Sequence, residues 1–403
     1  EHMSNIISIG HPQMCMQPGH VVGMGRTEDR IRQNDPTLTE LFVGSFNGNL
    51  HLRGGQNFGL CVPSDGASFA RLGNSIGENT SLVTVCFGGN LALGDDATRE
   101  FAKGLQRNSS IRKVRLSRCN LSEGAGCELL KAFEKNSSNL KEISLVRCDF
   151  GNGGFRTLTS TLSKCTGLAR ISLHFSEISD ELMGIFIGAI RKHHHLETLD
   201  LSSSNVGSTG CEALATLLKD TNSSLCVMAL DRNNIDNNGA IFLANALIGN
   251  TTLEELHLDG NHNITSVGWD AFSQVLCNTS SINDTYVSNH ILQSLEEFVS
   301  GAVPKELAHS LDLNCSSNDR KEIATKKVLL YHHHFDMAPF FEWGLKVLPL
   351  AVSWLDRARG FHSNNKANID VKILSSIYQF AKAMPMQFVP VTRRARAIAY
   401  QKR

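Results

Sequence analysis

The sequence repeats one pattern every 28 or 29 residues through about half of its length. Each copy opens with apolar residues at its first, fourth and sixth positions, as in Leu168, Ile171 and Leu173. So short a unit cannot bury its apolar side alone, and neighbouring copies must therefore stack into a continuous core. The openings that share this phase begin at Leu82, Ile111, Leu140, Leu168, Leu196, Leu225, Leu253 and Ile282.

Each copy predicts a short strand, a turn and a helix. Around the fourth and sixth positions apolar and polar residues alternate as in a strand, and further along the apolar residues follow helical spacing, as in Leu129, Leu130 and Phe133. Stacked copies predict an α/β solenoid with one parallel sheet. Because helices are wider than strands, we expect a horseshoe with a concave sheet, convex helices and a helical C-terminal cap.

The openings, written LxxLxL and followed by Asn and an apolar residue, resemble those of the ribonuclease-inhibitor-type leucine-rich repeat family. The resemblance covers roughly residues 82–291 and implies the fold without implying an activity. In that family a buried Asn or Cys after each strand bonds to the backbone of neighbouring turns. The resemblance implies this structural ladder for Asn90, Cys119, Cys148, Asn205, Asn233 or Asn234, and Asn261, with Ser176 or Glu177 as a departure in the fourth copy.

The segment before the repeats is predicted to close the first end of the array. Residues 1–37 are expected to form an N-terminal cap or a flexible start, and residues 38–81 a first repeat that carries an insertion. The next opening follows Leu38 by 44 residues instead of 28 or 29, and the excess is rich in Gly. We expect the inserted residues to form a loop or hairpin, either as a binding surface or as a flap over the first strand edge.

The segment after the repeats is predicted to close the other end. Residues 82–300 hold the leucine-rich repeats, and residues 301–403 are expected to form a helical C-terminal cap that ends in a basic tail. The string DMAPFFEWGLKVLPLAVSW resembles the tails of diatom-type leucine-rich repeat proteins, which implies no activity.

The composition argues against several classes of protein. Lys plus Arg and Asp plus Glu number 39 each, which gives no electrostatic reason to expect nucleic acid or an anionic membrane as the main partner. The eleven cysteines include no CxxC pair, which favours reduced thiols in the core over a disulfide scaffold. Without a secretory leader or an apolar run of about 18 residues, we expect a cytoplasmic protein with no membrane span, the nucleus or an organelle being the alternatives.

No constellation of residues predicts catalysis, a bound metal or a cofactor. The motifs of nucleophile elbows, zinc proteases and phosphate-binding loops are missing. Two histidine triplets, 193–195 and 332–334, are candidates for a metal site, but consecutive residues of a helix diverge and do not converge tetrahedrally. We interpret 193–195 as imidazolium groups at a helix C-terminus.

Six asparagines precede Ser or Thr by two residues, as N-glycosylation acceptors do. They recur where the helix of a copy is expected to end, and Asn tolerates the left-handed backbone of a helix cap. We therefore interpret them as cap residues rather than glycosylation sites: Asn79, Asn108, Asn136, Asn222, Asn250 and Asn278.

The third, fifth and seventh positions of each copy point away from the core and make up the concave face. Charge on this face is segregated, since the early copies are basic apart from Glu142 and the later copies are acidic apart from Arg232. We predict that the face and the strand ends bind a partner protein through Lys113, Arg115, Arg118, Arg147, Arg170, His174, Asp200, Asp231, Glu255, His257, Asp259, Asp284 and Tyr286.

The function expected from these features is that of a non-catalytic scaffold for protein–protein interaction. A dipolar surface suits a partner with complementary patches and steers its association. The family resemblance implies an alternative, namely a regulator of an enzyme, either an inhibitor of a basic enzyme or an activator of a small GTPase.

Overall fold

The computed structural model describes residues 24–44, 58–63, 65–88, 95–119, 121–148, 150–176, 178–295 and 304–332. The chain divides into two compact units, Glu1–Tyr331 and His332–Arg403. Every described helix and strand belongs to the first unit. The predicted basic tail and the apolar string that precedes it lie outside the described residues.

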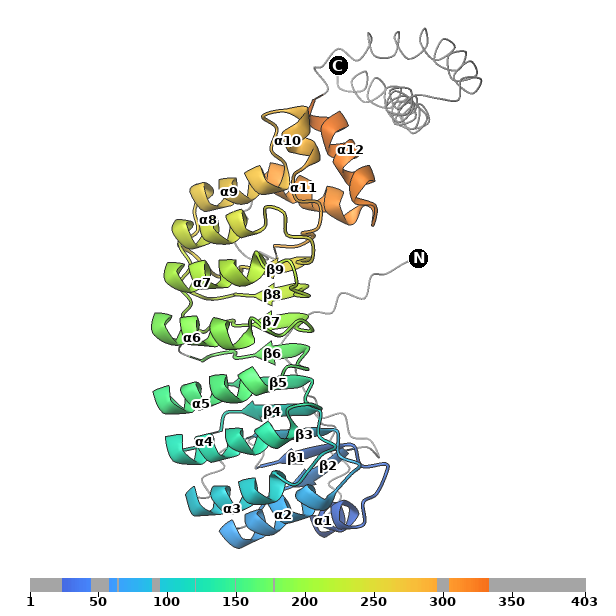
Figure 1. Ribbon diagram of the computed structural model, residues 1–403, viewed down its shortest axis with the longest axis vertical. Helices are drawn as coiled ribbons and strands as arrows, with labels where there is room; N and C mark the ends of the chain where they lie inside the picture. The colour runs from blue at the N-terminus through green and yellow to red at the C-terminus, as the bar shows by residue number, and fades with distance from the viewer. Residues whose placement is uncertain are drawn as a thin grey trace, which may run out of the picture. The chain divides into compact units, whose positions relative to one another are not determined.

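In the described part of the chain, nine strands form one sheet in the order β2-β1-β3-β4-β5-β6-β7-β8-β9. All neighbouring strands are parallel, and the helices lie along one face of the sheet (Figure 1). The predicted α/β solenoid is thereby confirmed. The strands are β1 (Glu40–Val43), β2 (Phe58–Cys61), β3 (Thr84–Gly88), β4 (Lys113–Ser117), β5 (Glu142–Val146), β6 (Arg170–Ser172), β7 (Thr198–Asp200), β8 (Val227–Ala229) and β9 (Glu255–His257).

Polar side chains fix where several helices begin. Asp65 accepts a hydrogen bond from the backbone N–H of Ser68 at 2.7 Å, and Ser68 Oγ accepts one from the backbone N–H of Asp65 at 3.1 Å. Ser122 and Asp236 accept in the same way at the starts of α4 and α8. The helices of the repeats are α2 (Gly66–Glu78), α3 (Asp95–Leu105), α4 (Glu123–Ala132, continued by a 3-10 turn), α5 (Gly151–Lys164), α6 (Asp180–Ile190), α7 (Ser208–Leu218), α8 (Asn237–Ala246) and α9 (Ser266–Leu276), with α1 (Met24–Arg32) before them.

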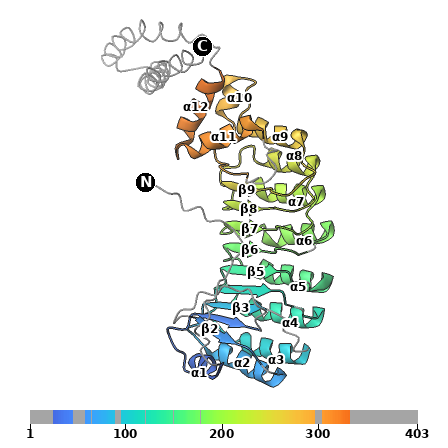
Figure 2. The ribbon, with the colours of Figure 1, turned by 180° about the vertical axis from the view of Figure 1, so that it is seen from behind.

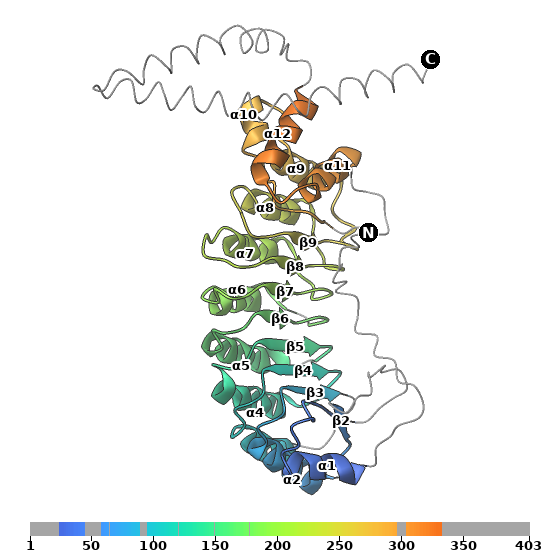
Figure 3. The same ribbon diagram turned by 90° about the vertical axis from the view of Figure 1, so that its right-hand side faces the viewer.

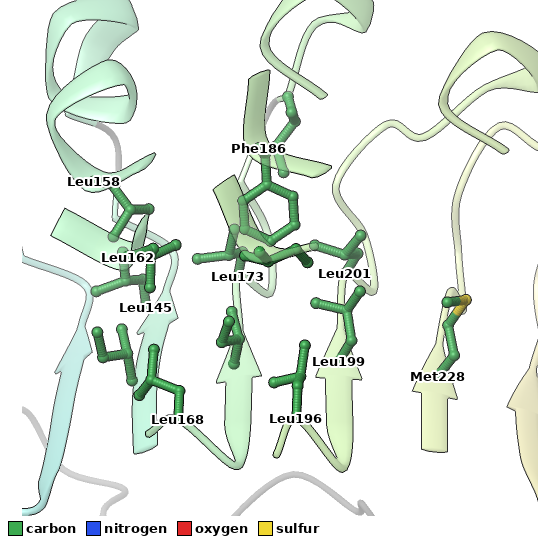
Figure 4. Close-up of a cluster of buried hydrophobic side chains, with 14 of the residues drawn as sticks. Leu145, Leu158, Leu162, Leu168, Leu173, Phe186, Leu196, Leu199, Leu201 and Met228 are labelled. Carbon is green, nitrogen blue, oxygen red and sulfur yellow. The ribbon is translucent and has the colours of Figure 1, made fainter. Parts of the chain in front are cut away.

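The core is a set of leucine rows that run from repeat to repeat between the sheet and the helices (Figure 4). Leu145, Leu173 and Leu201 occupy the sixth position of three successive repeats, and each is at most 2% exposed. Phe186 of α6 packs in the same cluster. Burial of each such side chain contributes about 2 kcal/mol, so the stacking of neighbours supplies most of the stability of a unit.

The inserted segment of the first repeat ends in a strand. Strand β2 pairs with β1, from Phe58 opposite Glu40 to Cys61 opposite Val43, and so forms the edge of the sheet. Figure 2 shows helix α1 beside α2 and β2 at this end, and both pairs are in contact. The last residues of the insertion therefore form a parallel strand that covers the edge of β1, which agrees with the predicted flap over the first strand edge. Residues 45–57 lie outside the described residues.

The predicted eighth opening at Ile282 is wrong. Ile282–Tyr286 form helix α10, and the Ile282 side chain is 37% exposed, whereas the first residue of an opening is buried. Asp284 and Tyr286 consequently lie on this helix and not on the sheet, and their assignment to the concave face was also wrong. The Ser281 hydroxyl caps the helix by accepting from the backbone N–H of Asp284 at 3.0 Å.

The last repeat opens at Leu292 instead. Leu292 and Leu295 are at most 2% exposed, and Ser294 forms a parallel bridge with Glu255 of β9. This opening follows Leu253 by 39 residues, because α10 is inserted between helix α9 and the final turn. The insertion breaks the period on which the prediction rested.

Helices α11 (Lys305–Cys315) and α12 (Arg320–Tyr331) cover this last repeat through buried polar contacts. Asn314 Nδ2 donates to the carbonyl of Leu292 at 2.6 Å. Lys327, which is fully buried, donates from Nζ to the carbonyls of Leu276 at 2.6 Å and Asn289 at 3.2 Å. Its cation thus lies at the C-terminus of α9, where it offsets the helix dipole, although burial lowers the pKa of Lys327 to about 8.

Candidate binding face

One face of the sheet lies opposite the helices, and we call it the open face (Figure 3). On β4, Val114 and Leu116 are buried in the core, so Lys113, Arg115 and Ser117 lie on the other side. The open face of β3 to β9 comprises Thr84, Cys86, Gly88, Lys113, Arg115, Ser117, Glu142, Ser144, Val146, Arg170, Ser172, His174, Thr198, Asp200, Ser202, Val227, Ala229, Asp231, Glu255, His257 and Asp259.

In-register pairing sets these side chains in rows across the strands. The row of third positions contains Lys113, Glu142 and Arg170 on consecutive strands, whose axes lie about 4.8 Å apart. The row of fifth positions contains Asp200 on β7 and His257 on β9. Residues about 28 positions apart in sequence are therefore direct neighbours on the face.

Glu142 joins two of the predicted basic residues. Arg115 contacts its Oε1 from Nη2 at 2.7 Å and from Nε at 2.8 Å, and Lys113 Nζ lies 3.9 Å from its Oε2. The Glu142 side chain is only 7% exposed, so its charge is desolvated and needs these partners. Part of the positive charge of the early repeats is thus neutralised within the face.

Three guanidiniums of the early repeats form no ion pair with a described carboxylate: those of Arg118, Arg147 and Arg170. All three residues are exposed. Arg118 and Arg147 follow β4 and β5 directly and take the left-handed backbone, each with φ 53°. The Arg147 guanidinium lies 4.1 Å above the ring of Phe175, an aromatic contact that the sequence analysis did not identify.

Asp200 lies at the centre of the face and is nearly buried. Its carboxylate accepts from Ser172 Oγ at 2.8 Å and from the backbone N–H of Ser202 at 3.0 Å, and His174 Nδ1 lies 3.8 Å away. Burial alone would raise the pKa of Asp200, but the hydrogen bonds from these neighbours outweigh it and lower the pKa. The carboxylate is therefore ionised and held in place.

A second acidic group lies at β8 and β9. His257, only 3% exposed, has Nε2 3.1 Å from Glu255 Oε2 and Nδ1 4.0 Å from Asp231 Oδ2. Asp231 also accepts from the backbone N–H of Asp259 at 2.8 Å. Burial raises the pKa of Asp231 to about 6, with the charges of Asp259 and Asp200 adding to the shift and His257 opposing it. This end of the face carries negative charge that depends on pH.

The predicted structural ladder after the strands is built from asparagine in two repeats. Asn233 Nδ2 donates to the carbonyls of Leu201 at 3.0 Å and Leu230 at 2.8 Å, and its Oδ1 accepts from Ser204 N at 2.9 Å. Asn261 repeats the arrangement one turn later. Asn205 does not belong to the ladder, because Ser204 occupies that position in its repeat and Asn205 itself is exposed with φ 57°.

Cysteines hold the ladder position in the earlier repeats. Cys119 donates from Sγ to the carbonyl of Ser117 at 3.7 Å, and Cys148 to that of Val146 at 3.5 Å. The hydrogen bond with the Cys148 thiol is the largest cause that raises the pKa of Cys119, and burial is the second, so the Cys119 thiol stays protonated. The predicted ladder residue Asn90 lies outside the described residues.

A second asparagine ladder, absent from the sequence-based prediction, lies where each helix leads into the next strand. Asn108 Nδ2 donates to the carbonyls of Ile76 and Asn79, both at 2.7 Å, and its Oδ1 accepts from the backbone N–H groups of Ser110 and Ile111, both at 2.9 Å. Asn108 is 2% exposed, so these bonds satisfy backbone groups that water does not reach.

The same contacts recur three residues before other openings, at Asn79, Asn250 and Asn289. Asn79 is the C-cap residue of α2, as interpreted, but its backbone is not left-handed, since its φ is −79°. The hydrogen bonds of its carboxamide explain why asparagine stands at this position. Glycosylation of Asn79 or Asn108 would require their exposure. The signal in the sequence is an Asn three residues before the opening, which also marks Leu292 as the true last opening.

Comparison with known proteins agrees with this geometry. A family model described as Leucine Rich repeat matches residues 192–215 and 249–273. The ribonuclease inhibitor of Sus scrofa is 28% identical over 199 residues, which cover 46% of this chain and 41% of the inhibitor. The chain is a ribonuclease-inhibitor-like leucine-rich repeat protein. The family resemblance predicted from the openings is thus confirmed.

Two further comparisons also cover part of the chain. NACHT, LRR and PYD domains-containing protein 14 of Mus musculus is 28% identical over 197 residues, which cover 48% of this chain and 20% of that protein. A solved structure titled Leiomodin-1 Actin-Binding Site 2 superposes on 42% of this chain and 94% of its own, with 17% identity and a TM-score of 0.34. The leucine-rich repeat chain thus spans less than half the length of the curated relatives named here.

One histidine of the first triplet of this leucine-rich repeat protein is not a cation at a helix end, contrary to the prediction. His193 takes the place of the second-ladder asparagine in its repeat and is 4% exposed. Burial lowers the pKa of His193, so the predicted imidazolium is wrong at this position. His194 and His195 are exposed. Of the other triplet only His332 is described, and among the described residues no three His, Cys, Asp or Glu side chains group as metal ligands would.

The ten described cysteines of the leucine-rich repeat protein are all free. Burial raises the pKa of Cys61, Cys165 and Cys211 to about 12 each, which keeps these thiols protonated within the core. In the portion of the chain that the structure describes, every helix is too short or too polar to cross a membrane.

Proposed function

We propose that this leucine-rich repeat protein is a non-catalytic scaffold that binds a partner protein through the open face. The observation that carries the proposal is the segregation of charge on a single sheet face. In the basic half, Arg170 on the open face and Arg118 and Arg147 at the adjoining strand ends remain without a carboxylate from the described residues, and Asp231 and Asp259 belong to the acidic half. A partner with patches of both signs would be steered into one orientation.

A protein suits this surface better than a nucleic acid does. A phosphate backbone carries negative charge along its whole length and would be repelled by the acidic half of the face. The equal numbers of basic and acidic residues in the chain, 39 each, point the same way. The pig relative is named as an inhibitor of ribonuclease, which is itself a protein.

A pair of charge reversals tests the proposal without changing the net charge. Arg170→Glu with Asp259→Lys reverses one charge in the basic half of the open face and one in the acidic half. Arg112→Glu with Glu254→Lys is the matched control, because these exposed residues hold the second position of the same kinds of repeat and precede the strands. The intact protein and both variants are used for affinity capture followed by mass spectrometry.

The expected result is a protein retained by the intact chain and the control but lost with the open-face variant. Retention of the same proteins by all three would remove the open face from consideration. Circular dichroism of each variant establishes that it is folded before the capture is interpreted.

The similarity to ribonuclease inhibitor favours a second candidate, regulation of an enzyme. Asp200, Asp231, Glu255 and Asp259 would then meet the basic surface of that enzyme. We would measure RNA hydrolysis by a basic ribonuclease, and GTP hydrolysis by a small GTPase, with increasing amounts of this protein. No effect on either rate would set this candidate aside.

The place of action that we propose is the cytoplasm. Ten free cysteines, most of them buried, support a reducing compartment. Imaging of the tagged protein in its source cells tests this, and a signal confined to an oxidising compartment would contradict it.

A further inference from the structure

The residue at the eighth position of the repeat, just beyond the strand, adopts the left-handed backbone conformation in six successive repeats. Only the last of them is glycine; the six are Arg118, Arg147, Phe175, Ser203, Arg232 and Gly260, with φ between 53° and 74°. Glycine takes this conformation without strain, whereas a side chain with a Cβ does not. An arginine at such a position has a backbone cost that the surrounding structure must offset, and strained residues of this kind cluster at functional sites.

Two of these strained arginines are neighbours. Arg118 and Arg147 occupy equal positions in adjacent repeats, and each donates its backbone N–H to the next repeat, at 2.9 Å to Val146 and 3.0 Å to His174. The backbone at both positions is therefore held by the sheet pairing. Their side chains extend from the ends of strands whose axes lie about 4.8 Å apart.

Among the described residues, the acid on the basic half of the open face is already engaged. Glu142 is paired with Arg115 at 2.7 Å and has Lys113 at 3.9 Å. No ion pair joins Arg118 or Arg147 to a carboxylate in the described part of the chain. Both residues are exposed, so their guanidiniums are available to an outside anion.

The contact between Arg147 and Phe175 orients one guanidinium before any partner arrives. Its central carbon lies 4.1 Å from the ring centroid, and a guanidinium stacked in this way keeps its N–H edges for ligands in its own plane. Phe175 itself takes the left-handed backbone, with φ 57°. Two strained residues thus cooperate to fix one cation, which lowers the entropy lost on binding.

We propose that Arg118 and Arg147 form a carboxylate clamp that holds an acidic segment of the partner protein at the strand ends of β4 and β5. This proposal rests on the proposed function, and it adds the chemistry of the segment and the residues that select it. Arginine forks bind carboxylates in a bidentate manner, and two forks one strand spacing apart suit two acidic side chains of one segment. The acidic residues on β7 to β9 disfavour a continuous polyphosphate at the same place.

The test uses selection of random dodecapeptides, displayed on phage, against the immobilised full chain at physiological ionic strength. The clamp variant is Arg118→Gln with Arg147→Gln, which removes both charges. The matched control is Arg232→Gln, because Arg232 is exposed and has the same left-handed backbone, with φ 54°, but belongs to the acidic half. Synthetic copies of selected peptides then give affinities by fluorescence anisotropy.

The clamp predicts peptides enriched in Asp and Glu on the intact chain and on the control, and no such enrichment on the clamp variant. Affinity for a selected acidic peptide should fall about tenfold for each guanidinium removed. A second variant, Arg118→Gly with Arg147→Gly, should lose the peptide equally and yet melt at least as high as the Gln variant, because glycine relieves the backbone. Equal binding of the acidic peptide by intact and clamp variants would overturn the clamp.

Other outcomes separate the clamp from the proposed function. Peptides that are lost with Arg170→Glu and Asp259→Lys but kept by the clamp variant would leave the open face as the binding site and refute the clamp alone. Absence of any selected peptide on the intact chain would count against both. Displacement of the acidic peptide by an equal concentration of oligothymidylate of the same length would also refute the clamp, since a nucleic acid would then be the better ligand.

Discussion

The second asparagine ladder gives the sharpest test of how the repeats are held together. Asn108→Ala removes a carboxamide that makes four bonds to backbone groups, at 2.7 Å to the carbonyls of Ile76 and Asn79 and at 2.9 Å from the N–H groups of Ser110 and Ile111. Asn108 is 2% exposed, so water cannot replace all of them. Each lost bond costs about 1 kcal/mol, and we expect the free energy of unfolding to fall by about 3 to 4 kcal/mol.

The chain supplies its own control for this substitution. Asn222 stands in the same Asn-Ser-Ser tripeptide, three residues before an opening, but its side chain is exposed. Its backbone N–H donates to Asp220 Oδ1 at 3.0 Å, whereas its carboxamide makes no hydrogen bond within the described part of the chain. Asn222→Ala should change the free energy of unfolding by less than about 0.5 kcal/mol.

Equilibrium unfolding in urea, followed by circular dichroism, measures both variants. The midpoint should shift strongly for Asn108→Ala and hardly at all for Asn222→Ala, with similar slopes for the two transitions. Equal shifts of the two midpoints would refute the reasoning. They would mean that loss of an asparagine at this position lowers stability whether or not its carboxamide makes buried hydrogen bonds.

Three further outcomes follow from the open face and the cap. The pKa of Asp231 is raised to about 6 and its side chain is 27% exposed, so its ionisation destabilises the fold increasingly as pH rises from 4 through 6. In urea unfolding, Asp231→Asn should be more stable than the parent by about 1 to 2 kcal/mol at pH 8 and equal to it near pH 4. Glu142→Gln should weaken the hold on Arg115 and lower stability by about 1 kcal/mol, and addition of salt should reduce this difference in thermal unfolding. Lys327→Met removes the donor to the carbonyls of Leu276 and Asn289 at a fully buried site, and we expect a loss of about 2 kcal/mol together with faster amide exchange in α12. A Lys327→Met protein as stable as the parent would show that the cap does not need this cation.

The repeat period alone predicts most of the architecture and most of the residues that share the candidate face. A phase of 28 or 29 residues sets Lys113, Glu142 and Arg170 at one position of successive units, and the strands indeed pair them in one row. The sequence period carries over into the spatial arrangement because every repeat packs on a similar neighbouring repeat. Where the period fails, as at Ile282, the prediction fails with it, since an inserted helix leaves no periodic mark.

Other features depend on contacts between turns that no single unit contains. Asn108 and Asn222 are the same residue in the same tripeptide, and only packing against the preceding repeat buries one and exposes the other. In the same way, the neighbour across the strand decides that Arg115 is paired while Arg118 and Arg147 are not. The sequence by itself determined the fold and which residues share a face. Tertiary structure decided which of their charges are neutralised and which backbone conformations are strained, because both depend on distances between repeats.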